Sequence, residues 1–399
     1  MPTATAIRPA RRTENIRYAV RDVLALAEEA QAAGRELLNL NVGDPNIFDF
    51  APSERLVNAT IDAIRGNRNG YAPSSGIAPA IEAITEEAER GGIENIQHVY
   101  VTSGASEAID LALSALADAG DNVLVPSPGY PLYTAVLAKL EVDARGYDLD
   151  ESANWEPDIE AIRGLIDERT RAIVLINPNN PTGCQCSNET LDALLELCVA
   201  HNIVLFSDEI YDKLTFDGRT HTCSASRRPD AKVITFNGLS KSYVVPGFRI
   251  GWGIISGPAD DLREYCEAIQ KMERARLSAN HPEQYAIPAV LGQCDDHIAS
   301  VVEKMQIRRD ITVDRLNAID GITCIAPQGA FYAFPRIELG ISDEQFCSEV
   351  IRETGVVIVP GSGFGQVEGT QHFRVVFLPP EDVLHRAYDA IAMIAGRYS

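Results

Sequence analysis

The chain has 399 residues, a length that allows one large domain or two domains of ordinary size. Hydrophobic residues make up 45% and charged residues 23% of it, so a disordered or collagen-like chain is excluded. No uninterrupted apolar run is long enough for a membrane span. The net charge of -22 gives an anionic surface that repels phosphate backbones, so nucleic-acid binding is not expected.

The N-terminus and the cysteines indicate a cytoplasmic protein. The first residues include several arginines with no apolar core after them, so no secretory signal is expected. The eight cysteines are scattered, which favours reduced thiols in a cytosol over a disulfide framework. Cys184 and Cys186 lack the usual spacing of zinc ligands and have no second pair nearby, so we expect no metal site.

In chain order, an amphipathic helix near residues 13–33 is followed by an array of predicted strands and helices. Short apolar runs predict strands at 99–102, 122–126, 172–177, 203–207, 232–236 and 250–255. Amphipathic helices are expected between them, at 105–118, 157–168 and 187–200. Strands rich in Val and Ile that alternate with helices indicate an α/β fold, with a mostly parallel sheet covered on both faces.

The C-terminal part has a different pattern. Helices are expected near 296–319, near 343–353 and from about residue 380, with short apolar strands between them. This arrangement predicts a small α+β domain, and the first 48 residues are expected to pack against it because they precede the array of strands and helices. We therefore predict a large domain at 49–295, and a small domain formed by 1–48 and 296–399 with an N-terminal arm.

Two charged side chains follow predicted strands in apolar surroundings. Asp208 ends the run IVLFSD, where ligand crevices form in parallel sheets, although taken alone it is more simply a cap of the next helix. Lys241 lies in a stretch with almost no other charge until Arg249. A lysine in such surroundings has a lowered pKa and can form Schiff bases, and the arginine can bind a phosphate. An exposed loop with an extended lysine would also explain the pattern.

Two turns complete the set of motifs. The small residues of S-G-A-S at 103–106 would let backbone N–H groups approach an anion at a helix N-terminus, although a simple serine cap is an alternative. The prolines of I-N-P-N-N-P-T-G at 176–183 fix a turn that presents Asn180 over the sheet edge, or they form a rigid polar turn only. Together, a lysine for an aldehyde, a cup with Arg249 for a phosphate and Asp208 for a ring nitrogen match pyridoxal 5'-phosphate.

The order of these motifs resembles the class I/II aminotransferases of the fold-type I pyridoxal-phosphate superfamily. The segments that carry the resemblance are S-G-A-S, P-G-Y-P, N-P-N-N-P-T-G, D-E-I-Y, S-K and R-I-G-W. IRYAVRD, LNVGDP, FNGLSK and HFRVVFLP are further similar to bacterial glutamate-pyruvate (alanine) aminotransferases. The resemblance covers essentially the whole chain. It implies a large three-layer domain that binds the cofactor and a small α+β domain.

The resemblance implies roles for the residues around the cofactor. Lys241 would hold the cofactor covalently and then shuttle the proton, and Asp208 would keep the pyridine nitrogen protonated. Tyr211 and Asn180 would donate hydrogen bonds to the phenolic oxygen. Tyr130 would stack on the ring.

The phosphate would be bound from two subunits. Ala105, Ser106 and Arg249 would supply its donors within one chain. Tyr71, in G-Y-A-P-S-S-G, resembles the tyrosine that reaches the phosphate of the neighbouring subunit, which implies a homodimer with shared sites.

Other residues would bind the substrate. Arg374 would hold its α-carboxylate as a bidentate fork, near Asn180, and Gly43 would let its own backbone approach the same carboxylate. Tyr18 and Arg21 lie three positions apart on the N-terminal segment and would share a helix face. We hypothesise that Arg21 pairs with the distal carboxylate of glutamate and swings aside for alanine. A solvated arginine on an amphipathic helix is the alternative.

Two positions differ from aspartate-type relatives. Gly238 stands where those enzymes usually have a phosphate-binding serine, which leaves the phosphate cup one donor short. No arginine falls at the position they use for a side-chain carboxylate, since Arg276 is one place off.

The function expected from the sequence is reversible transamination between glutamate and pyruvate, with amino acids and 2-oxo acids as the only partners besides a second subunit. An aspartate, branched-chain or aromatic aminotransferase on the same scaffold is the alternative. A lyase or decarboxylase with the same cofactor is a further one. A non-catalytic pyridoxal-phosphate regulator is remote, because the residues before position 13 are too few for a DNA-binding segment and the net charge is unsuitable.

Overall fold

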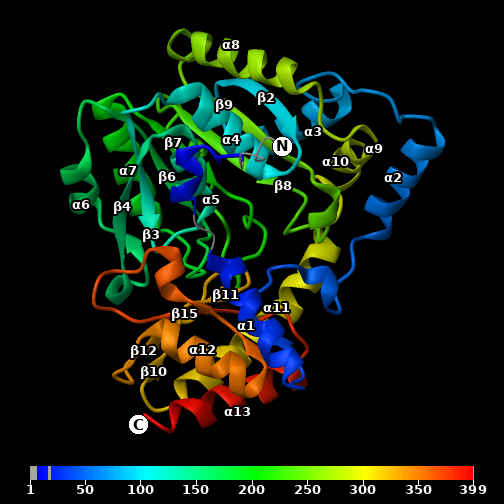
Figure 1. Ribbon diagram of the computed structural model, residues 1–399. Coiled ribbons are helices and arrows are strands. Elements are labelled where there is room, and N and C mark those ends of the chain that lie inside the picture. Colours follow the sequence, from blue (N-terminus) through cyan, green and yellow to red (C-terminus); the bar gives the residue numbers. More distant parts are fainter. Residues whose placement is uncertain (1–6, 17–18, 399) are drawn as a thin grey trace, which may run out of the picture.

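The computed structural model describes residues 7–16 and 19–398, and within these the side chains of residues 15 and 19–22 are not described. An eight-stranded sheet forms its centre (Figure 1). Across the sheet, the strands are β2 (Ile96–Thr102), β9 (Gly251–Ser256), β8 (Val233–Gly238), β7 (Val204–Asp208), β6 (Thr170–Ile176), β3 (Asn122–Ser127), β4 (Asp143–Asp150) and β5 (Glu156–Pro157). Only β9 and the short β5 run against the others, which confirms the predicted mostly parallel α/β sheet.

Helices cover both faces of this sheet and complete three layers. β6 shows why, because Val174 packs into one apolar cluster while Ile173 and Leu175 pack into the other. One face carries α4 (Ala105–Leu116), α5 (Leu132–Leu140) and α8 (Ala259–Arg276). The other face carries α3 (Ala78–Arg90), α6 (Ile159–Leu165), α7 (Asn188–His201) and α10 (Ala286–Val290), with α2 (Glu54–Arg65) and α9 (His281–Gln284) beside them.

The C-terminal elements build a second body around their own core, drawn below the sheet in Figure 1. Its helices are α11 (Asp295–Asn317), α12 (Asp343–Thr354) and α13 (Glu381–Ala395). Its strands are β10 (Ile322–Thr323), β11 (Tyr332–Ala333), β12 (Arg336–Ile337), β13 (Val356–Val357), β14 (Val359–Pro360) and β15 (Phe373–Val376). The β11, β14 and β15 strands form an antiparallel sheet with β15 in the middle.

The N-terminal segment packs on this second body. The helix α1 (Ala19–Ala32) lies against α12, and the strand β1 (Leu38–Asn39) pairs in parallel with β13. Short 3-10 turns also occur, among them η1 (Arg11–Asn15), η2 (Pro45–Ile47), η3 (Glu151–Ala153), η4 (Ser224–Ser226), η5 (Pro246–Phe248) and η6 (Gly361–Phe364). We propose that domain boundaries near residues 49 and 295 follow this division of the chain.

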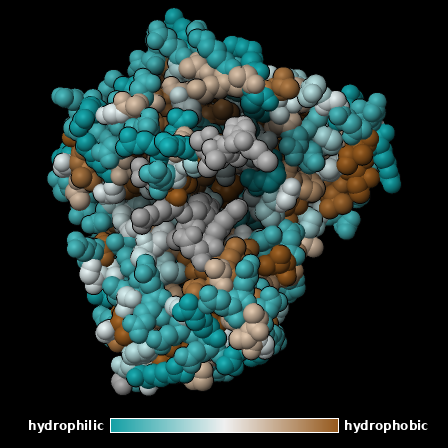
Figure 2. All heavy atoms as spheres, viewed as in Figure 1, coloured by the Kyte–Doolittle hydropathy of each residue, from teal (hydrophilic) through white to brown (hydrophobic). Residues whose placement is uncertain are grey.

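The predicted strands and most of the predicted helices agree with the structure to within a few residues, but the helix expected near 13–33 begins only at Ala19, and β4 and the short β5 were not predicted. β4 gave no apolar run, because its sequence DARGYDLD carries four charged residues and buries only Tyr147 and Leu149. Among the described residues, no helix combines the length and the apolar character that crossing a membrane requires. Hydrophilic residues cover most of the face seen in Figure 2, and hydrophobic residues gather at its right-hand side over α2, where Ile64 is 49% exposed.

Candidate active site

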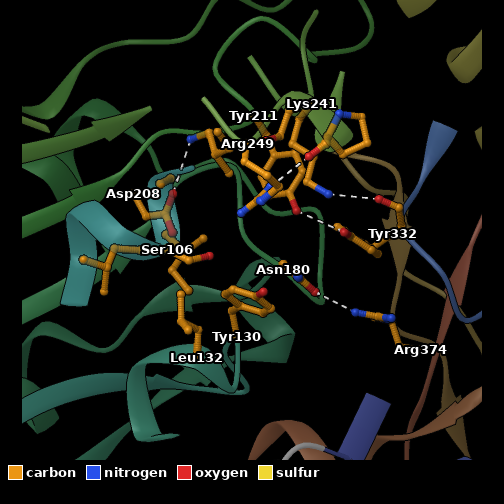
Figure 3. Close-up of a pocket in the computed structure, with 17 residues that line it drawn as sticks. Ser106, Tyr130, Leu132, Asn180, Asp208, Tyr211, Lys241, Arg249, Tyr332 and Arg374 are labelled. Atoms are coloured by element: carbon orange, nitrogen blue, oxygen red, sulfur yellow. Dashed lines mark hydrogen bonds between the residues drawn. The ribbon is translucent and has the colours of Figure 1, made fainter. Parts of the chain in front are cut away.

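A cavity of about 230 Å³ lies at the carboxyl ends of β6, β7 and β8, against the N-terminus of α4 and facing β11 and β15 (Figure 3). Ten residues predicted from the sequence line it together: Gly43, Ala105, Ser106, Tyr130, Asn180, Asp208, Tyr211, Lys241, Arg249 and Arg374. Tyr71 is not among the lining residues and is 84% exposed. Tyr18 lies outside the described residues, and Arg21 belongs to α1 but its side chain is not described.

Asp208 is the last residue of β7 and its side chain is buried in the cavity wall. Its carboxylate accepts hydrogen bonds from the Tyr133 hydroxyl at 3.1 Å and from the Ile210 N–H at 3.4 Å. Burial raises the pKa of Asp208 to about 6, although the Tyr133 bond and the charge of Lys241 act in the opposite direction. A buried carboxylate of this kind is stabilised by a cation that lies next to it.

Lys241 stands three residues after the end of β8, on the opposite side of the cavity. Its Nζ donates to the carbonyl oxygen of Gly43 at 2.9 Å and lies 5.4 Å from the centre of the Phe331 ring. Burial, helped by the charges of Arg374 and Arg249 and opposed by nearby carboxylates, lowers the pKa of Lys241 to about 8. The side chain is therefore close to the neutral form that attacks a carbonyl carbon.

The hydroxyl groups of two tyrosines that line the cavity contact each other. The Tyr211 hydroxyl lies 3.0 Å from that of Tyr332, and the rings pack edge to face. Burial raises the pKa of Tyr211 well above its usual value, so the hydroxyl keeps its proton. The packing explains why residue 43 is a glycine, because the Tyr332 hydroxyl occupies the place that a Cβ would take.

Arg374 occupies the end of the cavity on β15 and is 2% exposed. Its guanidinium donates to Asn180 Oδ1 at 3.2 Å and to the carbonyl oxygen of Asn41 at 2.6 Å. The ring centres of Tyr332 and Phe364 lie 4.7 and 4.8 Å from its Cζ. The fork is thereby held in one orientation, which suits bidentate binding of a carboxylate.

The other end of the cavity is built to bind an anion. The helix α4 begins after Gly104, which has φ 81° and supplies no side-chain cap, so Ala105 and Ser106 present the first N–H groups of the helix. Arg249 adds a guanidinium, fixed by a 2.9 Å bond to the carbonyl oxygen of Pro246. The guanidinium packs where a Cβ of residue 104 would stand.

Steric contacts also explain why residue 238 is a glycine and not the phosphate-binding serine of aspartate-type relatives. A Cβ at this position would lie 2.7 Å from the carbonyl oxygen of Ile250 and 2.9 Å from the Cα of Gly251. A serine at residue 238 therefore does not fit while β8 and β9 keep this spacing.

Arg276 does not line the cavity. It donates to the carbonyl oxygens of Val101 at 2.6 Å and Ser74 at 3.2 Å, and its Nε lies 3.6 Å from the Glu107 carboxylate. These contacts attach the loop that contains Tyr71 to the end of β2.

Sequence reasoning missed Tyr133 and Tyr332. Tyr133 stands three residues after Tyr130, on the turn of α5 that faces Asp208. The only available signal was its place in P-G-Y-P-L-Y, directly after a predicted cofactor residue. Tyr332 lies in G-A-F-Y-A-F-P, a segment rich in aromatic residues that could equally have been core.

The comparisons with known proteins agree with this arrangement. The aminotransferase class I and II family matches residues 35–391, so the chain belongs to the class I and II aminotransferases and is an enzyme with a fold-type I architecture. The glutamate-pyruvate aminotransferase of Haemophilus influenzae is 38% identical over 96% of this chain and 97% of its own length. The alanine aminotransferase of Pyrococcus furiosus superposes with a TM-score of 0.95 and 40% identity, over 98% of this chain and 100% of its own. An aspartate aminotransferase of Geobacillus stearothermophilus is 32% identical over 92% of this chain and 93% of its own length.

Proposed function

We propose that this enzyme uses pyridoxal 5'-phosphate to exchange an amino group between glutamate and pyruvate. The observation that carries the proposal is one cavity that holds Lys241, Asp208 and an anion cup at one end and Arg374 at the other. The names of the relatives from Haemophilus influenzae and Pyrococcus furiosus support the choice of substrates.

The residues of the cavity fit the cofactor. The N-terminus of α4 and Arg249 are suited to its phosphate, since the helix has no side-chain cap of its own. Asp208 is a buried carboxylate whose raised pKa calls for a cation, which a protonated ring nitrogen would supply. When bound, pyridoxal 5'-phosphate supplies an aldehyde that links to amines and a ring that accepts electrons.

The chain's own residues then have distinct tasks. Asp208 holds the proton on the ring nitrogen, and Tyr211 and Asn180 hydrogen-bond the phenolic oxygen. Arg374 binds the α-carboxylate of the amino acid and so fixes which bond at Cα stands in reach of Lys241. The Nζ of Lys241, with a pKa of about 8, would take the proton from Cα and deliver it to C4' of the cofactor, the carbon that carried the aldehyde. Tyr130 stacks on the ring.

We infer that two chains share their sites. Tyr71 is 84% exposed on a loop that Arg276 holds rigidly, and it does not reach the cavity of its own chain. The neighbouring α2 leaves Ile64 49% exposed. A second copy of the chain would cover these apolar side chains and receive Tyr71 at its phosphate.

To accept glutamate as a substrate, the site needs a cation that pairs with its distal carboxylate. Arg276 is engaged by the carbonyl oxygens of Ser74 and Val101, which argues against an aspartate-type role for it. We keep Arg21 as the proposed partner of that carboxylate. Arg21→Ala is expected to raise the KM for glutamate and 2-oxoglutarate and to leave that for alanine and pyruvate nearly unchanged. An equal loss for both pairs of substrates in steady-state kinetics would contradict this role.

A panel of amino donors and keto acceptors on the purified protein tests the proposed reaction. Glutamate with pyruvate is expected to give the highest kcat/KM. Faster turnover of aspartate with 2-oxoglutarate, or steady keto acid formation without an acceptor, would contradict it.

A further inference from the structure

Glu209 follows Asp208 in the chain and faces the opposite side of the sheet, because successive residues of a strand alternate in direction. Its side chain is only 4% exposed, and each carboxylate oxygen has a polar partner. Oε1 accepts hydrogen bonds from the Ser207 hydroxyl at 2.8 Å and the Ser224 N–H at 3.0 Å. Oε2 lies 2.9 Å from Nε2 of His221.

The far side of this pair opens into a second cavity, of about 660 Å³, behind the active site. Three buried atoms that belong to its lining residues have no hydrogen-bond partner among the described residues: His221 Nδ1, Thr235 Oγ1 and Tyr243 OH. The His221 side chain is 9% exposed and belongs to the cavity wall, while its Nδ1, the nitrogen that does not contact Glu209, is itself buried. The pair is therefore an almost enclosed ion pair at the edge of the cavity.

Opposite charges hold the pair together. Burial lowers the pKa of His221, but the carboxylates of Glu209 and Asp212 outweigh it and raise that pKa above the usual value. Burial also raises the pKa of Glu209, but His221 and the hydrogen bonds outweigh it, so the carboxylate stays ionised. The other ionisable groups around the cavity are Asp212, Lys213, Arg219 and Cys223 beside the pair, Glu87 and Arg90 on α3, Asp295 on α11, and Tyr243.

The pair lies directly behind the catalytic carboxylate. The charge of Glu209 raises the pKa of Asp208, and a protonated His221 offsets that charge. Glu209 also continues the strand, because its N–H donates to the carbonyl oxygen of Phe236 at 2.9 Å. A rotation of the Asp208 backbone would therefore displace the Glu209 carboxylate, which contacts three donors: the Ser207 hydroxyl, the Ser224 N–H and the His221 ring.

We propose that Glu209 and His221 are a positioning pair that orients Asp208 and balances the charge behind it. A purely structural role, which ties the segment at 221–224 to the end of β7, is the rival explanation. The proposal rests on the proposed function, since Asp208 matters only if it faces the cofactor.

The pH at which the absorption band of the bound cofactor changes reports this charge balance. His221→Gln keeps a donor for Glu209 but removes the positive charge, so the uncompensated carboxylate stabilises positive charge in the site. The midpoint is expected to rise by about half to one pH unit. The double variant Glu209→Gln, His221→Gln is again neutral, and its midpoint is expected to return to that of the wild type. Equal midpoints in all proteins, or a larger shift in the double variant, would overturn the proposal.

Melting of the apoprotein gives a readout without cofactor. Because the folded pKa of His221 is raised, its stabilisation is complete below the unfolded value of about 6.5 and is lost as pH rises through the folded value. The Tm deficit of His221→Gln should therefore shrink from about pH 6 towards alkaline pH. A deficit independent of pH would mean a structural role only.

Ser224→Ala is the matched control, since it removes the 2.9 Å contact of that hydroxyl with Ser207 but keeps the backbone bond to Glu209 and all charges. It should lower Tm without moving the midpoint. A wild-type protein that binds no pyridoxal phosphate would refute the proposed function itself. A wild type that binds the cofactor and transaminates, with an unchanged midpoint in His221→Gln, would refute the positioning pair alone.

Discussion

At the scale of single residues, burial moves the pKa values of an acidic and a basic group of the site towards neutral pH. It raises the pKa of Asp208 to about 6 and lowers that of Lys241 to about 8. The interval between these values is where Asp208 is ionised and Lys241 still accepts and releases a proton readily. Burial beyond the carboxyl ends of β7 and β8 is the largest cause of both shifts.

Tyr133→Phe tests how Asp208 is kept ionised. The hydroxyl bond lowers the pKa of Asp208, so its loss moves that pKa above about 6 and leaves the group protonated over more of the neutral range. The affinity of the apoprotein for pyridoxal phosphate is expected to fall below about pH 7 and to recover at higher pH. Fluorescence titration across pH measures this.

Asp208→Asn provides the reference for Tyr133→Phe, because it cannot ionise at any pH. Its cofactor affinity should lack the pH dependence and its transamination rate should fall by about a hundredfold or more. A Tyr133→Phe protein with the affinity profile of the wild type would show that the hydroxyl does not act on Asp208.

At the scale of elements, the sequence predicted the strands whose ends carry the site and missed two strands of the same sheet, β4 and β5, whose ends do not. The runs at 172–177, 203–207 and 232–236 are continuous and apolar because β6, β7 and β8 are buried on both faces. β4 alternates charged with apolar residues and pairs with only two-residue β5 on its outer side, so no apolar run marked it. Likewise, motif spacing placed Asp208 and Lys241, but only packing shows that Tyr133 reaches the carboxylate.

Gly104→Ala tests the anion cup at the start of α4. A methyl group there takes the place of the Arg249 guanidinium and is strained at φ 81°. The Kd for pyridoxal phosphate is expected to increase about tenfold or more. Gly34→Ala is the matched control, since Gly34 has φ +83° with no atom within 4 Å of a Cβ. An equal effect of both substitutions on Kd would mean that backbone strain alone, and not Arg249, explains the loss.

At the scale of the whole molecule, we propose that a second chain completes the active site. Tyr71 is 84% exposed and does not line the cavity of its own chain. The resemblance of the sequence to the family predicts this arrangement, whose contact lies between two copies of the chain.

Hybrid dimers test the shared sites. In a dimer of one Lys241→Ala chain and one Tyr71→Phe chain, one site contains neither substitution and the other contains both. Random mixing should therefore restore about a quarter of the wild-type rate, well above the Lys241→Ala protein and above the mean of the two parents. A rate equal to that mean after subunit exchange, or a fully active monomer in sedimentation, would rule out the composite site.

The lysine to which pyridoxal phosphate is attached tests the proposed function most directly. Borohydride reduction of the purified enzyme with pyridoxal phosphate, followed by peptide mapping, is expected to place the pyridoxyl group on Lys241, in the peptide FNGLSK. A label on any other lysine of the chain, or no label on a protein that still transaminates, would contradict the central claim.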